Sequence, residues 1–158
     1  VPSVRSVETR VGAGYYQTDI YRKYEFDVPL PTKVLLVDDE REFVETLSER
    51  LRMREVSSAV AYNGREALDV VDADEPEVMV LDLKMPGIDG LEVLRKVRDE
   101  HPDVEVIVLT GHGSEEIRRI CMEMGACAYL EKPVEMENLT AAMKEAYDRV
   151  KQRKARQR

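Results

Sequence analysis

The sequence predicts an α/β protein: a (βα)5 domain whose five parallel strands form a doubly wound sheet of order 2-1-3-4-5. Two observations support this fold class. From residue 32 onward, short apolar runs alternate with segments of helical periodicity. The apolar runs are continuous, as is typical of strands that are buried on both faces of a parallel sheet. The segments are joined by short turns, so right-handed crossovers are expected.

The first half of this pattern predicts three strands and two helices. In the first helix, Phe43, Leu47 and Leu51 recur every four residues and should form its inner face. Asn63-Gly64 forms a turn that begins the second helix, and Glu75-Pro76 ends it, because the residue before a proline disfavours helix. The expected strands cover residues 33–37, 56–61 and 78–82, and the first helix covers residues 40–54.

The second half predicts two more strands and three more helices. Asp89 and Ser114 precede apolar residues at helical spacing, so each is expected to begin a helix. His101-Pro102 closes the first of these helices, and Gly125 fits the end of the second. The expected strands cover residues 104–109 and 127–131, and the last helix covers residues 135–154.

The chain divides into three parts on this basis. Residues 1–31 do not follow the strand–helix pattern, and they are expected to be an N-terminal extension. It is either an arm or linker that packs on the body or on a second subunit, or a remnant of a preceding domain. Residues 32–150 form the predicted domain. The basic residues 151–158 continue the last helix as an extension or as a linker toward an output domain, in preference to a nucleic-acid-binding arm.

Charge and cysteine content limit the classes of function. The net charge is −8, but residues 32–150 carry −13, because the last eight residues are strongly basic and the first 31 balance. Such an acidic body argues against nucleic acid as the main ligand. No apolar stretch is long enough to span a bilayer, and no signal-peptide pattern is present. Cys121 and Cys127 have no nearby metal-type partners and are expected to be reduced, packed thiols of a cytoplasmic protein.

Acidic residues end two neighbouring strands of the predicted sheet. Asp38 and Asp39 follow the first strand, and Asp82 ends the third. Ligands of doubly wound sheets bind at the carboxyl ends of the strands, so the three carboxylates should converge there. Like charges that lie this close raise one another's pKa. A hard divalent cation relieves that repulsion, and the residue types favour Mg²⁺.

Two further strand ends supply groups that suit a phosphoryl ligand. Thr110 follows the fourth strand and Lys132 follows the fifth. An aspartate nucleophile needs an incoming phosphoryl group in line and neutralisation of its oxygens. An ammonium, a hydroxyl and Mg²⁺ together meet this need. No glycine-rich nucleotide loop is present, which argues against ATP or NAD as the ligand.

These residues lie in motifs that resemble the response-regulator receiver domain of two-component signalling, a family of flavodoxin-like fold. The resemblance covers residues 33–150, and the motifs occur in the order and spacing of the family. They are Val37-Asp38-Asp39-Glu40, the run from Leu81 to Gly90, Leu109-Thr110-Gly111-His112-Gly113, and Tyr129-Leu130-Glu131-Lys132-Pro133.

The resemblance implies a role for each site residue. Asp82 would accept the phosphoryl group from a phosphohistidine of a sensor histidine kinase or a phosphotransfer protein. Asp39, together with Asp38 mostly through water, Asp82 and the backbone carbonyl of Lys84, would bind Mg²⁺. Thr110 and Lys132 would bind phosphoryl oxygens, and Tyr129 would be the aromatic switch that turns inward when Thr110 moves. The Lys132-Pro133 bond would be cis.

Two positions that vary within the family, Lys84 and His112, are large or cationic here. They could shield the acyl phosphate or steer a donor, or they could simply project into solvent.

The predicted function is therefore a signalling switch and not an enzyme. Its output would come through partner contact, homodimerisation or an effector domain outside this chain. An Mg²⁺-dependent phosphatase of the haloacid-dehalogenase type is the enzymatic alternative. It is disfavoured because Asp38 and Asp39 are adjacent instead of two apart and the chain has no room for a cap domain. A receiver that acts only as an unphosphorylated scaffold is disfavoured because every expected site residue is present.

Overall fold

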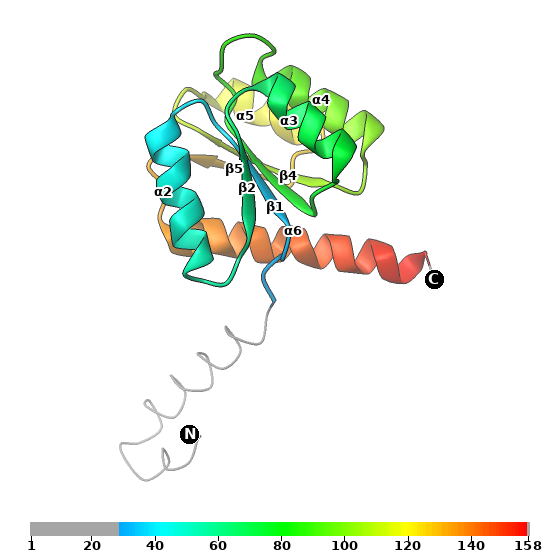
Figure 1. Cartoon of the computed structure of the whole chain (residues 1–158). Coiled ribbons are helices and arrows are strands. Elements are labelled where there is room, and N and C mark those ends of the chain that lie inside the picture. Colours follow the sequence, from blue (N-terminus) through cyan, green and yellow to red (C-terminus); the bar gives the residue numbers. More distant parts are fainter. Residues whose placement is uncertain (1–28, 158) are drawn as a thin grey trace, which may run out of the picture.

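The computed structural model describes residues 29–157 of the 158-residue chain. A parallel sheet of five strands lies at its centre, in the order β2-β1-β3-β4-β5. Helices cover both faces of this sheet: α3, α4 and α5 lie on one side, and α2 and α6 on the other (Figure 1). The predicted fold class and strand order are confirmed. Most of the predicted N-terminal extension, including its four tyrosines, lies outside the described residues.

The five strands match the apolar runs of the sequence. They are β1 (Val34–Val37), β2 (Ser58–Ala61), β3 (Val78–Leu81), β4 (Glu105–Thr110) and β5 (Ala128–Glu131). The register sets Val37 beside Leu81 and Leu81 beside Val108. The residues that directly follow β1 and β3 therefore leave the sheet at the same edge. β4 begins and ends one residue later than predicted, because Thr110 still pairs with Glu131 of β5.

The five described helices also follow the predicted order. They are α2 (Arg41–Arg52), α3 (Gly64–Ala73), α4 (Gly90–Glu100), α5 (Glu115–Glu123) and α6 (Met136–Arg156). Three predicted N-terminal residues act as caps: Asn63 accepts a hydrogen bond from Glu66 N at 2.9 Å, Asp89 from Glu92 N at 3.0 Å, and Ser114 from Ile117 N at 3.2 Å. Each cap satisfies a backbone donor that the first helical turn leaves unpaired.

The core consists of one apolar cluster on each face of the sheet. Successive strand residues alternate between the clusters: Leu35 and Met79 belong to the first, and Leu36 and Val80 to the second. All four side chains are buried. Burying such a side chain is worth roughly 1.5–3 kcal/mol relative to leaving it in water, so the two clusters provide most of the favourable free energy of folding.

Helix α6 ends at Arg156, two residues beyond the expected bound of 154, so most of the basic residues after 150 continue the last helix (Figure 1). The Arg153 side chain of α6 binds the carboxylate of Glu105, a residue at the start of β4 that is only 2% exposed. Arg153 also donates a hydrogen bond to the backbone carbonyl oxygen of Asp103 at 3.0 Å. The basic segment after residue 150 thus contributes a contact to the sheet.

Three smaller predictions are also confirmed. The Lys132-Pro133 peptide bond is cis, and Gly125 follows the last turn of α5 with a positive φ of 103°. Both cysteines are free and buried. Among the described residues, no helix combines the length and the apolar character that crossing a membrane requires.

Candidate functional site

Asp82 lies at the centre of the candidate site, directly after β3. Its backbone N–H donates to the carbonyl oxygen of Val37 at 2.9 Å, which continues the β1–β3 ladder and fixes the side chain at the sheet edge. The residue is 3% exposed, and its Oδ1 atom is buried without a hydrogen-bond partner. Burial, and then the charge of Asp38, raise the pKa of Asp82. A buried carboxylate oxygen without a hydrogen-bond partner is costly, so this geometry favours a ligand that binds Oδ1 and neutralises the charge.

Asp38 is the second buried carboxylate, directly after β1. It is 4% exposed. Its Oδ1 accepts a hydrogen bond from the backbone N–H of Glu40 at 2.9 Å, and its Oδ2 accepts one from Lys132 Nζ at 2.7 Å. These two bonds orient the Asp38 carboxylate toward the same edge of the sheet as Asp82.

Lys132 brings a positive charge to the two aspartates. Besides Asp38, its Nζ donates to Glu40 Oε1 at 2.6 Å, and it lies 3.9 Å from Asp82 Oδ2. The ammonium also lies 4.4 Å from the centroid of the Phe43 ring. Burial by itself would lower the pKa of Lys132, but the hydrogen bonds to Asp38 and Glu40 outweigh it, so the pKa is raised. The lysine is therefore held in its charged form within reach of the buried carboxylate of Asp82.

Glu40 is a site residue that the sequence interpretation missed. Its carboxylate is largely exposed, and the hydrogen bond from Lys132 lowers its pKa. Oxygens of Asp38, Glu40 and Asp82 lie within 4.8 Å of one another. Asp39 is exposed and is not a member of this group. The sequence signal for Glu40 was its position directly after the acidic pair, at the start of α2.

Thr110 ends β4, next to Asp82, and Tyr129 lies on the neighbouring strand β5. Thr110 is fully buried, and its Oγ1 accepts a hydrogen bond from the backbone N–H of His112 at 3.2 Å. The Tyr129 hydroxyl is buried without a hydrogen-bond partner, and burial raises its pKa. It fills the space above Gly113, where an added Cβ would lie 1.5 Å from the hydroxyl oxygen. Tyr129 is thus turned inward, next to the end of β4.

Lys84 and His112 are exposed residues at the rim. They line one surface depression together with Met85, Asp89 and Ile117. Both side chains therefore lie where a molecule that approaches from this side would meet them, although they also project into solvent, as the simpler interpretation predicted.

The residues present fit a hard divalent cation. The group offers only carboxylate oxygens, and one of the buried oxygens, Asp82 Oδ1, lacks a partner within the protein. Mg²⁺ prefers oxygen ligands and usually binds through one or two carboxylates while it keeps several waters. The adjacent Lys132 does not compensate the full negative charge of Asp38, Glu40 and Asp82. An additional cation would therefore stabilise the arrangement.

Comparisons with known proteins point to one family. The family model described as the response regulator receiver domain matches residues 34–144. Among curated proteins, the response regulator MprA of Mycolicibacterium vanbaalenii is 41% identical over 115 residues, which cover 73% of this chain and 50% of that protein. The chain thus spans about half the length of the curated relatives it matches.

Solved structures agree with this result. A response regulator receiver domain from Clostridium thermocellum has a TM-score of 0.72 and 31% identity, and the match covers 76% of this chain and 97% of that one. A response regulator from Burkholderia pseudomallei, determined with a phosphorylated aspartic acid, a calcium ion and citrate, has a TM-score of 0.67 and 31% identity, with 78% and 73% coverage.

Proposed function

Because this chain belongs to the response regulator receiver domain family, we propose that it is a signalling switch that accepts a phosphoryl group on Asp82. One observation carries the proposal: the buried Asp82 carboxylate, whose Oδ1 atom lacks a hydrogen-bond partner, lies at the same sheet edge as Asp38, Thr110 and the ammonium of Lys132. These are the groups that in-line phosphoryl transfer to a carboxylate requires. The donor is a phosphohistidine of a sensor histidine kinase or a phosphotransfer protein.

In the transfer step, a carboxylate oxygen of Asp82 attacks the phosphorus atom of the donor. The new O–P bond forms as the P–N bond breaks, and the electron pair of that bond leaves with the donor imidazole. Lys132 lies 3.9 Å from Asp82 and can exchange a carboxylate partner for a phosphoryl oxygen. The hydroxyl of Thr110 donates to a second phosphoryl oxygen. Both residues thus stabilise negative charge that the site must gain.

We propose that Mg²⁺ is held by the carboxylates of Asp38, Asp39 and Asp82 and by the backbone carbonyl of Lys84. The carboxylate of Glu40 joins this set, because it lies close to those of Asp38 and Asp82. The ion supplies positive charge that neutralises phosphoryl oxygens. The protein's own part is to hold the carboxylates of Asp38 and Asp82 in place at the sheet edge.

Millimolar Mg²⁺ is expected to stabilise the fold, because it relieves the repulsion between Asp38 and Asp82. At a free concentration of ten times the dissociation constant, the gain would be about 1.4 kcal/mol. Thermal unfolding with and without Mg²⁺ measures it. The shift should disappear in Asp38→Asn and persist in Asp69→Asn, which removes an exposed carboxylate of α3. A melting temperature that does not respond to Mg²⁺ would count against the metal site.

We propose that Thr110 and Tyr129 form the switch. When Thr110 moves toward the phosphoryl group, the inward position of Tyr129 gains room and becomes the favoured one. Phosphorylation then shifts an existing equilibrium instead of creating a new state. A Cβ atom at Gly113 would lie 1.5 Å from the Tyr129 hydroxyl oxygen and 3.3 Å from the Thr110 methyl group, so the space that Tyr129 occupies borders both residues.

Gly113→Ala is expected to exclude Tyr129 from the inward position, because the new methyl group would lie 1.5 Å from the hydroxyl oxygen and 2.8 Å from ring carbon Cζ. The φ angle of Gly113 is not positive, so alanine can adopt the same backbone conformation and the clash with Tyr129 is the main effect of the substitution. NMR of labelled tyrosine rings, assigned with Tyr129→Phe, should show a solvent-exposed ring. Gly111→Ala is the matched control, since its nearest neighbouring atoms are 3.8 Å away. An unchanged Tyr129 signal in Gly113→Ala would contradict this account of the switch.

Beryllofluoride, a stable mimic of a phosphoryl group, tests the site without a kinase. Fluorine NMR should detect one bound beryllofluoride per chain in the presence of Mg²⁺, and Asp82→Asn should lose it. Binding that does not need Asp82 would overturn the proposal.

The proposed switch also needs an output, a place of action and a class of partner. Output would come through partner contact, homodimerisation or an effector domain, and the protein would act in the cytoplasm without turnover of a separate substrate. The acidic residues 32–150 disfavour direct contact with nucleic acid.

A further inference from the structure

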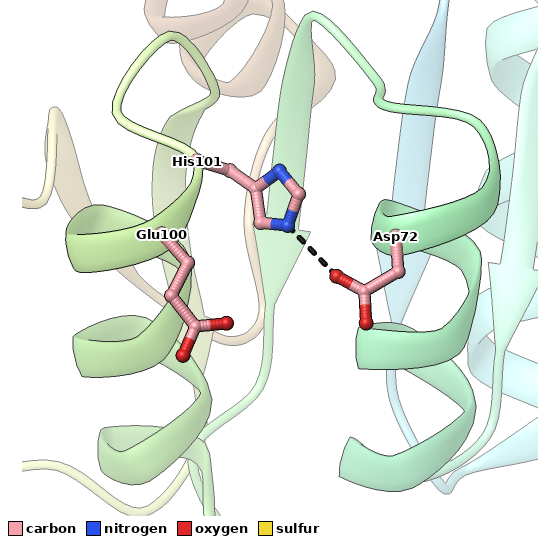
Figure 2. A group of neighbouring side chains, drawn as sticks. All are labelled: Asp72, Glu100 and His101. Atoms are coloured by element: carbon pink, nitrogen blue, oxygen red, sulfur yellow. Dashed lines mark hydrogen bonds and ion pairs between the residues drawn. The ribbon is translucent and has the colours of Figure 1, made fainter.

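His101 forms ion pairs with two carboxylates, and none of these residues belongs to the candidate site around Asp82. It follows the last turn of α4, and its ring is turned toward the C-terminal end of α3 (Figure 2). Nε2 lies 2.8 Å from Asp72 Oδ1 of α3, and Nδ1 lies 2.7 Å from Glu75 Oε2 in the segment that leads to β3. The imidazole is 19% exposed. One side chain thus bridges two helices and the following connection.

The two contacts require two donors on the imidazole ring. A neutral imidazole has one N–H and one lone pair, so one of its nitrogens would face a carboxylate oxygen with no proton between them. Only the imidazolium form donates to Asp72 and Glu75 at once. The geometry therefore matches the charged ring.

The charged surroundings favour the same form. Glu100 of α4 is a third nearby carboxylate (Figure 2). One carboxylate oxygen each of Asp72 and Glu100 and a ring nitrogen of His101 all lie within 4.8 Å of one another. The hydrogen bond to Glu75 raises the pKa of His101, burial opposes this, and the hydrogen bond to Asp72 raises it further. On balance the pKa is raised above its usual value of 6.5.

We propose that His101 is a pH-sensitive clamp that ties the end of α4 to the end of α3 while its ring is charged. At its other end, α4 begins at Gly90, where an added Cβ would lie 2.4 Å from the Cα atom of Leu83, the residue after Asp82. Helix α4 therefore runs from the candidate phosphoryl site to the clamp. The clamp closes as pH falls and opens as pH rises.

The direction follows from proton linkage. The unfolded chain binds a proton at His101 with the ordinary pKa of 6.5, whereas the folded chain holds it more tightly. The contribution to stability is fully present below pH 6.5 and is lost as pH rises through the raised pKa. Within that window, one linked proton changes the opening equilibrium by at most about tenfold for each pH unit.

NMR titration of the imidazole protons tests the clamp, together with hydrogen exchange at the end of α4. The chain has two histidines, so in His112→Gln the remaining imidazole signal belongs to His101. We expect a pKa above 6.5 that falls in Asp72→Asn and in Glu75→Gln. Amide protection at the end of α4 should drop with rising pH, after correction for intrinsic exchange, and His101→Gln should abolish this pH dependence.

The matched control is Asp69→Asn, one turn earlier on α3, which should leave the His101 pKa unchanged. A His101 pKa at or below 6.5, or one that the Asp72 and Glu75 substitutions do not move, would overturn the proposal. So would the same pH dependence of protection in His101→Gln, because the linked proton would then reside elsewhere. None of these outcomes depends on phosphorylation, so they test the clamp separately from the proposed function.

Discussion

Asp82→Asn is expected to lose phosphoryl acceptance completely while it remains folded. The amide is not a nucleophile for phosphorus, and no other buried carboxylate occupies the end of β3. The same change should make the protein more stable in Mg²⁺-free buffer at neutral pH. Burial and the charge of Asp38 raise the pKa of Asp82, so the ionised form is unfavourable in the fold, and the neutral amide removes that penalty.

Urea unfolding in the presence of a chelator measures the gain in stability, and a parallel incubation with acetyl phosphate and Mg²⁺ measures phosphoryl uptake. Asp89→Asn is the matched control: asparagine keeps the N-cap of α4, so uptake should be retained. An Asp82→Asn protein that takes up phosphate like the wild type would show that another group is the acceptor. A loss of stability would show that the Asp82 charge is compensated in the fold.

Arg153→Met is expected to destabilise the fold by about 3 kcal/mol, the lower end of the cost of leaving a buried charge without its partner. The Glu105 side chain is 3% exposed, and the Arg153 guanidinium binds its carboxylate directly. For a domain of this size, the melting temperature would fall by roughly 10 °C. Differential scanning calorimetry measures the fall.

The two partners should respond unequally. Glu105→Gln leaves a polar group that can still accept a hydrogen bond, and Arg153 is 28% exposed and can reach water, so this change should cost less than Arg153→Met. The double variant Arg153→Met with Glu105→Leu should recover much of the loss, since it leaves no buried charge. Arg156→Met, at the exposed end of α6, is the control without an effect. Equal losses for Arg153→Met and Arg156→Met would mean that the pair does not stabilise the fold.

The fold could be predicted from local patterns because the strands and caps are local. The runs Val34–Val37 and Val78–Leu81 are short, continuous apolar segments, as is typical of strands buried on both faces of a parallel sheet. The carboxyl ends of parallel strands lie at one edge of a sheet, so the expected convergence of Asp38 and Asp82 needed only the strand assignment, and the observed register agrees with it. The caps Asn63, Asp89 and Ser114 act within three residues and are visible in the sequence for the same reason.

The contacts that escaped the sequence interpretation join distant charged residues. Lys132 meets Glu40 across 92 positions, and Arg153 meets Glu105 across 48. Glutamate, arginine and lysine are normally solvated, and neither their type nor their spacing indicates which of them pair after folding. Asp39 is exposed and lies outside the carboxylate group, which the sequence also did not reveal. Adjacent residues at a strand end point in different directions, and their order in the sequence does not show which side chain turns inward. The roles of these residues are therefore proposals for experiment.

Intact mass spectrometry of the wild-type protein, incubated with acetyl phosphate and Mg²⁺ beside Asp82→Asn, decides whether Asp82 is the phosphoryl acceptor. We expect the wild type to gain a single phosphoryl group, about 80 Da, and to lose it on treatment with hydroxylamine, as an acyl phosphate does, whereas the variant should gain none. A phosphoryl group that persists in Asp82→Asn, or a wild type that gains neither the phosphoryl group nor bound beryllofluoride, would contradict this role of Asp82.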